Sequence, residues 1–214
     1  MATQDTLLYF SSRGRAEAIR MLYLMAGREF NDTRTTNEKW LQEKNENPVA
    51  LGQLPVLFTE DGVFCQSNVI ARYVAKKLGL MGDNLREETT HDLVVEITME
   101  FINYNGQNIY KHVLFGVPEP ENFAEVKEEV KEYITKRLLY IQSIAEKEGK
   151  EYIVSDEIGL ADIWLYTGLE LCRVPFPDIM DFTPWTTEFA AKFTSNKKMK
   201  SYLESRPPSQ FHGL

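Results

Sequence analysis

The chain changes its hydrophobic pattern near residue 80, and this change limits the possible folds more than any other feature. Residues 1–80 mix short runs typical of β-strands with helical patterns, whereas residues 87–204 show a helical period almost throughout. The change predicts an α/β domain, residues 1–80, followed by an all-α domain, residues 81–214. The segment 79–88 contains two glycines and four charged residues, so we interpret it as a linker that few contacts cross.

The pattern of the first domain predicts the order β, α, β, α, β, β, α. The apolar run Thr6–Phe10 ends at a Ser-Ser-Arg-Gly turn, as a buried strand that leads into a helix does. The runs 54–58 and 63–65 flank the turn Glu60–Gly62 and predict an antiparallel hairpin. Ser67 then opens a helix that Gly79 ends.

The second domain is predicted to consist of helices. Helical patterns near 87–105 and 126–145 are separated by a segment with two prolines, which indicates an antiparallel helical hairpin. The first of these helices carries two apolar stripes, so it is covered on two sides and one of these sides could face a partner. A shorter and more apolar helix near 160–172 is expected at the centre of the domain, and 184–204 supplies one or two more.

Composition and charge argue against several classes of function. The 32 acidic residues outnumber the 24 basic ones, and the resulting net charge of -8 argues against a nucleic-acid partner. No apolar run approaches the roughly 18 residues of a membrane-spanning helix, and Met1–Thr6 lacks the features of a signal peptide. We therefore expect a cytoplasmic protein that does not enter membranes.

The common motifs of metal and nucleotide chemistry are missing from the sequence. There is no GxGxxG, GxxxxGK[ST], HExxH or GxSxG motif, and Cys65 and Cys172 lack the spacing of a zinc cluster or a disulfide scaffold. His91, His112 and His212 lie in polar or terminal contexts without metal-ligand spacing, so we expect them on the surface and expect no metal.

Four short runs resemble motifs of one known family. Tyr9–Glu17, Gly52–Pro55 and Gln66–Tyr73 are similar, in order and spacing, to the N-terminal motifs of cytosolic glutathione transferases, specifically of the sigma class. That class includes invertebrate enzymes and a glutathione-dependent prostaglandin D synthase. Gly159–Asp162 resembles the helix-capping segment of the C-terminal domain, although Gly159 replaces the usual Ser or Thr and predicts a weaker cap.

The resemblance implies a fold, a co-substrate and an assembly. The fold is a thioredoxin-like α/β domain that binds glutathione, followed by an all-α helical domain that lines the site of an electrophile. This glutathione transferase fold agrees with the order of elements read from the pattern. Glutathione is implied as co-substrate, without a metal, and the active unit is expected to be a homodimer.

The resemblance also implies catalytic roles for Tyr9 and Arg15. The hydroxyl of Tyr9 would donate a hydrogen bond to the glutathione sulfur, and Arg15 would add a nearby positive charge. A cysteine thiol has an ordinary pKa of about 8.5, so a site that favours the thiolate makes it a better nucleophile. On the sequence alone two alternatives stay open: Ser11 or Ser12 activates the thiol, or Tyr9 is only a buried strand tyrosine.

The remaining glutathione contacts are implied by the same motifs. A cis Leu54–Pro55 bond would expose the backbone of Leu54 to the peptide, and a helix start at Gln66 and Ser67 would suit a carboxylate. The alternative for this pair is simple helix capping. The full expected set is Tyr9, Arg15, Trp40, Lys44, Gln53, Leu54, Pro55, Gln66, Ser67 and, from the partner subunit, Glu100. For Glu100 an ion pair within one subunit is the alternative.

The electrophile is expected in an apolar cleft with a few polar groups. The residues expected to line it are Phe10, Ser12, Gly14, Ile102, Tyr104, Gln107, Trp164 and Gly168. The resulting hypothesis is a transferase that conjugates glutathione to small hydrophobic electrophiles. Two alternatives are a glutathione-dependent prostaglandin-type isomerase, which Gln107 disfavours because such relatives carry tryptophan near this position, and a non-catalytic binding or crystallin-like protein.

Overall fold

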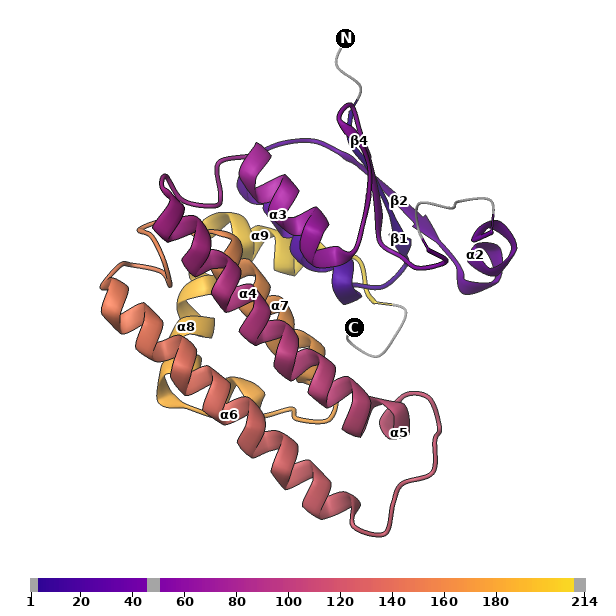
Figure 1. The fold of residues 1–214 in the computed structure, drawn as a ribbon, viewed down its shortest axis with the longest axis vertical. Helices are drawn as coiled ribbons and strands as arrows, with labels where there is room; N and C mark the ends of the chain where they lie inside the picture. Colours follow the sequence, from indigo (N-terminus) through magenta and orange to yellow (C-terminus); the bar gives the residue numbers. More distant parts are fainter. Residues whose placement is uncertain (1–3, 46–50, 210–214) are drawn as a thin grey trace.

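The computed structural model describes residues 4–45 and 51–209 (Figure 1). Its first half has the predicted order of strands and helices. Strands β1 to β4 and the helices between them are β1 (Thr6–Phe10), the short helix η1 (Gly14–Ala16), α1 (Glu17–Met25), β2 (Asn31–Thr35), α2 (Asn37–Glu43), β3 (Val56–Thr59), β4 (Gly62–Cys65) and α3 (Ser67–Lys77). The predicted α/β domain is confirmed.

The four strands form one mixed sheet in the order β2-β1-β3-β4. Strand β1 is parallel to β2, as expected of two strands joined by a helix, and β3 is antiparallel to β1 and to β4. Successive side chains of β1 face opposite sides of the sheet. Leu7 and Tyr9 join the large core beneath α1 and α3, and Leu8 packs with Trp40 of α2 on the other side. Phe10, at the end of the strand, contacts both clusters.

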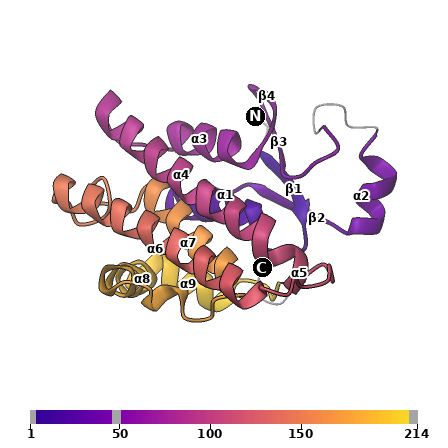
Figure 2. The same cartoon turned by 60° about the horizontal axis from the view of Figure 1, so that its bottom comes forward.

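The second half is helical and contains α4 (Leu85–Asn105), a π-helical turn labelled η3 (Gly106–Tyr110), α5 (Lys111–Val113), α6 (Phe123–Glu148), α7 (Leu160–Cys172), a short helix η4 (Ile179–Asp181), α8 (Pro184–Ser195) and α9 (Lys197–Ser205). Helices α4 and α6 run side by side in opposite directions, and α7 lies behind them (Figures 1 and 2). Every residue of α7 is buried, which confirms its central place. Within the described ranges, no helix is long and apolar enough to cross a membrane.

The two domains share one continuous hydrophobic core. Leu7 and Ile19 of the first domain belong to the same buried cluster as Leu165 and Phe193 of the second. The segment between the domains is also held: Leu160 N–H donates to the Leu80 carbonyl at 2.9 Å. The expectation of a linker that few contacts cross is therefore wrong, because the apolar outer faces of the first domain's helices are covered by the second domain.

The two apolar stripes of α4 are both covered within the chain. Ile97 and Phe101 on one stripe, and Val95 and Met99 on the other, are all buried. Leu93 stays exposed. Most of both stripes therefore packs against neighbouring helices of the same chain, and a contact between this helix and a partner stays a prediction.

His91 is buried and caps a helix that belongs to another part of the chain. The Ala161 N–H at the start of α7 donates to Nδ1 of His91 at 3.1 Å. A Cβ atom on Gly159 would lie only 2.6 Å from Cε1 of this ring, so the imidazole fills the space of a capping side chain. The expected surface position is wrong for His91, while His112 is partly exposed and His212 lies outside the described residues.

Candidate active site

Tyr9 stands at the end of β1 and is enclosed by the loop that follows. Its side chain is 8% exposed, and its hydroxyl oxygen accepts a hydrogen bond from the Arg15 N–H at 3.2 Å. The loop approaches closely because Gly14 adopts a φ of +44° and has no side chain. A Cβ atom there would lie 2.5 Å from the Tyr9 oxygen.

The surroundings of Tyr9 keep its phenol protonated. Burial raises the pKa of Tyr9 above its ordinary value, while the Arg15 N–H and the charges of Arg15 and Arg20 oppose the rise. The Arg20 guanidinium carbon lies 5.8 Å from the centre of the ring. A neutral phenol whose oxygen already accepts one hydrogen bond is free to donate its proton to a ligand atom.

The exposed side chain of Arg15 reaches across to the second domain. Its Nη2 donates to Oδ1 of Asn103 on α4 at 3.0 Å. This contact holds the guanidinium beside two adjoining cavities, both of which Arg15 lines. The positive charge is therefore fixed near Tyr9 by both domains.

The first cavity, of about 520 Å³, lies in the first domain between α2, the start of β3 and the start of α3. It is lined by Phe10, Arg15, Asn37, Trp40, Leu41, Lys44, Gly52, Gln53, Leu54, Pro55, Gln66 and Ser67. The structure thus brings together all the residues that the motifs predict for glutathione within one subunit, except Tyr9, which lines the adjoining cavity.

The local geometry of the first cavity follows from loop and helix ends. The Leu54–Pro55 bond is cis, as the resemblance implied. Gln66 has a φ of +71° and donates from Nε2 to Oε1 of Gln53 at 3.5 Å, and it makes no capping bond to α3. The first N–H groups of α3, next to the buried Ser67, point from a helix start and suit an anionic group.

The second cavity, of about 1040 Å³, lies between the domains and is mostly apolar. It is lined by Tyr9, Phe10, Ser12, Gly14, Arg15, Asn37, Ile102, Asn103, Gly106, Gln107, Tyr110, Leu114, Phe115 and Leu171. Phe10, Arg15 and Asn37 border both cavities, so a ligand in the first can present an atom to a ligand in the second. Of the residues predicted for the electrophile, Phe10, Ser12, Gly14, Ile102 and Gln107 line this cavity.

Three residues predicted for the electrophile lie elsewhere. Tyr104 stacks on Tyr133 of α6, with 4.1 Å between ring centres. Trp164 is buried inside α7, and Gly168 faces α4, where a Cβ atom would lie 2.5 Å from Cγ2 of Thr98. All three residues stand on the faces of α4 and α7 that pack inside the helical domain, so they contact neighbouring helices and not the cavity.

Several residues of the second cavity were missed from the sequence. Tyr110 belongs to the π-helical turn after α4, and Leu114 and Phe115 follow α5. A π-helical turn changes which side chains face a given direction, and such turns often accompany functional sites. The only local signal is the apolar run at 113–115, and Phe115 is 75% exposed at the edge of the cavity.

Glu100 pairs within its own chain. Its exposed carboxylate accepts a hydrogen bond from Nε of Arg137 on α6 at 3.2 Å. This is the ion pair that the sequence left open as an alternative, and a contact to glutathione in a partner subunit stays a prediction. Over the described part of the chain, no three His, Cys, Asp or Glu side chains gather in a way that could hold a metal ion.

Comparisons with known proteins point to one family. Residues 5–76 match the family described as "Glutathione S-transferase, N-terminal domain", and residues 107–206 match "Glutathione S-transferase, C-terminal domain". The chain is 36% identical over 207 residues to "Glutathione S-transferase 3" of Caenorhabditis elegans, covering 96% of this chain and 98% of that protein.

Solved structures agree with this similarity. A monomeric glutathione S-transferase of the hookworm Necator americanus superposes with a TM-score of 0.84 at 31% identity, covering 98% of this chain and all of that one. A glutathione S-transferase of Ascaris lumbricoides gives a TM-score of 0.86 at 25% identity, covering 97% of this chain and 99% of that one.

Proposed function

The chain belongs to the glutathione S-transferase family, and from this premise we propose that Tyr9 activates the glutathione thiol for attack on small hydrophobic electrophiles. The enzyme is a glutathione transferase and uses glutathione as co-substrate. The observation that carries the role of Tyr9 is its position: the protonated hydroxyl lines the second cavity, between the domains, and its neighbours Phe10 and Arg15 line both cavities. The isomerase and crystallin-like alternatives are not favoured.

Thiol activation requires the anion to be stabilised. The Tyr9 hydroxyl donates to the glutathione sulfur, and the Arg15 N–H on the Tyr9 oxygen makes it a stronger donor. The guanidinium of Arg15 adds a positive charge to the same region. Lowering the thiol pKa by two units takes about 2.7 kcal/mol, which one hydrogen bond and one nearby charge can supply. The sulfur then forms a bond to an electrophilic carbon, whose leaving group departs or whose neighbouring atom takes a proton.

The first cavity supplies the remaining contacts of glutathione. The start of α3 at Gln66 and Ser67 binds the γ-glutamyl carboxylate, and the backbone of Leu54 pairs with the cysteine residue. Trp40 and Lys44 donate to the glycine carboxylate. This arrangement directs the sulfur toward Tyr9 and the interdomain cavity, where apolar side chains receive the electrophile.

We also propose a class, a cellular role and an oligomeric state for this enzyme. The runs Tyr9–Glu17 and Gln66–Tyr73 support the sigma class, and membership of the glutathione S-transferase family supports a cytoplasmic role in detoxification. We propose a homodimer in which Glu100 of the partner subunit contacts the γ-glutamyl amine. Exposed apolar side chains at Leu51, Val69 and Leu93 support an interface, although the similar hookworm protein is described as monomeric.

The deciding experiment is an ultraviolet titration of the thiolate of glutathione bound to wild type and to Tyr9→Phe. The wild type is expected to lower the thiol pKa by roughly two units, and Tyr9→Phe to return it toward the free value while keeping glutathione bound. The conjugation rate at neutral pH should fall by about tenfold or more.

Tyr104→Phe is the matched control, because it removes a tyrosine hydroxyl from α4 without touching either cavity. It should behave as wild type. If the bound thiol has the same pKa in wild type and Tyr9→Phe, the activating role of Tyr9 is wrong.

A further inference from the structure

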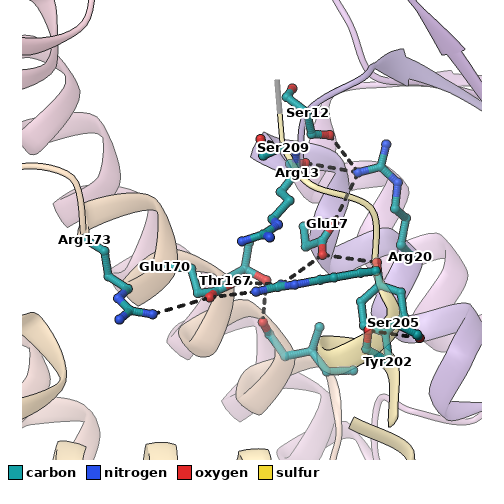
Figure 3. Close-up of polar contacts among 12 residues, drawn as sticks. Ser12, Arg13, Glu17, Arg20, Thr167, Glu170, Arg173, Tyr202, Ser205 and Ser209 are labelled. Atoms are coloured by element: carbon teal, nitrogen blue, oxygen red, sulfur yellow. Dashed lines mark hydrogen bonds and ion pairs between the residues drawn. The ribbon is translucent and has the colours of Figure 1, made fainter. Parts of the chain in front are cut away.

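A short segment after α9, residues 206–209, crosses from the helical domain to the loop that follows β1 (Figure 3). Two of its residues contact groups of the first domain. Arg206 reaches Glu17 of α1, and Oγ of Ser209 accepts a hydrogen bond from the Arg13 N–H at 3.5 Å. The end of the described chain is therefore tied to the loop that encloses Tyr9.

Arg206 joins two buried carboxylates that belong to different domains. Its Nη1 donates to Glu17 at 3.1 Å and to Glu170 of α7 at 2.7 Å, and its Nη2 donates to Glu170 at 2.9 Å. The three side chains are only 8%, 3% and 9% exposed, respectively. One guanidinium thus bridges two acids that are largely shielded from water, and its fork geometry suits both contacts at once.

From Glu17, the hydrogen bonds continue to the loop after β1 that encloses Tyr9. The second oxygen of Glu17 accepts from Nη1 of Arg20 at 3.1 Å. The same Nη1 donates to the carbonyls of Ser12 at 2.9 Å and of Arg13 at 3.3 Å. These carbonyls lie two and three residues before Arg15, whose N–H binds the Tyr9 oxygen. Figure 3 shows Arg20 between Glu17 and Ser12.

The position of Arg20 against the loop carbonyls depends on Arg206, because both arginines pair with Glu17. Without Arg206, the nearest cation to Glu170 is Arg173 at 3.9 Å, and Glu17 keeps Arg20 as its cation, with the Tyr202 hydroxyl donating to its other oxygen at 3.1 Å. Arg20 is already shared with Asp32, which its Nε contacts at 3.1 Å. When Arg206 is absent, Glu17 attracts Arg20 more strongly, because a buried carboxylate without its partner is costly. Arg20 then moves away from the two loop carbonyls.

We propose that Arg206 is a positioning residue for the transferase reaction. By neutralising Glu17 and Glu170 together, it holds Arg20 against the loop carbonyls, and so fixes the Arg15 N–H and the Tyr9 hydroxyl relative to the sulfur. This inference rests on the proposed function of Tyr9. It gives the C-terminal segment a part in thiol activation, although Arg206 lines neither cavity.

The test compares Arg206→Met with wild type by the thiolate titration of bound glutathione and by kcat and KM across pH. We expect the bound thiol pKa to rise and kcat at neutral pH to fall by about tenfold, with KM for glutathione changed by less than about twofold, since sub-ångström displacement affects the reacting groups most. Arg206→Lys keeps the positive charge but loses the forked guanidinium, so its thiol pKa and kcat should lie between those of wild type and Arg206→Met.

Arg86→Met is the matched control, since Arg86 forms an ion pair with Glu148 between α4 and α6 and has no contact with the loop after β1. It should leave the thiol pKa and kcat unchanged. If Arg206→Met does not fold, the same measurements on Arg206→Lys decide. The proposal is overturned if the folded variants lose thermal stability but keep the wild-type thiol pKa and kcat, or change KM alone. A wild type without any thiol shift would instead contradict the role of Tyr9.

Discussion

Gly14 shows how a single residue controls the geometry of the Tyr9 hydroxyl. The loop after β1 passes so close to Tyr9 that only hydrogen fits at the α-carbon of residue 14. The positive φ of this residue also disfavours any L side chain. Both restrictions come from the need to bring the Arg15 N–H onto the phenol oxygen.

Gly14→Ala is expected to displace the Tyr9 hydroxyl. The added methyl group would lie 2.5 Å from the oxygen, so the ring or the loop must move. The conjugation rate should fall by at least about tenfold, and the free energy of unfolding by about 1–2 kcal/mol. Steady-state kinetics and urea denaturation measure the two effects.

Gly27→Ala separates the effect of backbone strain from the effect of contact with Tyr9. Gly27 also has a positive φ, of +62°, but nothing lies within 4 Å of an added Cβ atom. This variant should lose stability and keep full activity. Equal losses of activity in both variants would show that strain alone, and not contact with Tyr9, explains the effect of Gly14→Ala.

Helix α7 depends on α4 at its start and along its length. Gly159 offers no side chain to the first turn, and His91 supplies the acceptor for the Ala161 N–H in its place. Asp162 accepts hydrogen bonds from the Gly159 and Ile153 N–H groups, both at 3.0 Å. The start of the central helix is therefore held by side chains that are distant in sequence or one turn further on.

The buried cap makes stability depend on pH. Burial lowers the pKa of His91 to about 4, against the opposing charges of Glu87 and Asp92. The unfolded imidazole titrates near pH 6.5, so the contribution of His91 is fully present above that pH and is lost as pH falls toward 4. The loss amounts to about 3 kcal/mol. Urea unfolding of wild type and His91→Gln between pH 4.5 and 7.5 measures it.

His91→Gln also serves as the control, since the glutamine side chain does not titrate. Burial raises the pKa of Asp162 to about 6, so its contribution is lost as pH rises from about 4 to 6, opposite in sign to that of His91. The difference between wild type and His91→Gln removes this second effect. A difference that does not change with pH would contradict the buried, neutral imidazole.

The close approach of α7 and α4 requires Gly168. An added methyl group would lie 2.5 Å from Cγ2 of Thr98 and 3.1 Å from Cζ of Phe101. We expect Gly168→Ala to lower the free energy of unfolding by about 1–3 kcal/mol, because an overpacked helix contact must open. Gly106→Ala, where no atom lies within 4 Å, should be neutral or slightly stabilising, and equal values for both would contradict the close contact.

At the scale of the whole molecule, the proposed homodimer makes two testable predictions. Sedimentation equilibrium should give about twice the chain mass of 24.8 kDa if the active unit is a homodimer. Glu100→Gln should then raise KM for glutathione with little change in kcat, because in the proposed dimer the partner's Glu100 contacts a part of the substrate that does not react.

Glu96→Gln is the matched control, since Glu96 is an exposed acid one turn earlier on α4 that pairs with Arg72. It should keep the wild-type KM. A monomer at all concentrations, or equal KM values for both variants, would contradict the role of Glu100 across the subunits.

Much of this protein follows from local sequence. The order of elements, the hairpin and the central α7 were predicted because each depends on hydrophobic period, turn residues and helix ends that lie close together in the chain. The residues of the first cavity were predicted from the resemblance of short motifs to those of glutathione transferases. These residues stand at the ends of consecutive elements of one small domain, and short motifs carry them.

The interdomain cavity, the buried His91 and the contacts of Arg206 were decided by the tertiary structure. Tyr110, Leu114 and Leu171 meet Tyr9 only after helices far apart in sequence have packed on one core. Likewise, the polar sequence around His91 gives no sign of burial, since Gly159 creates the space from another helix. Such features depend on which faces of distant helices meet, and long-range packing determines that.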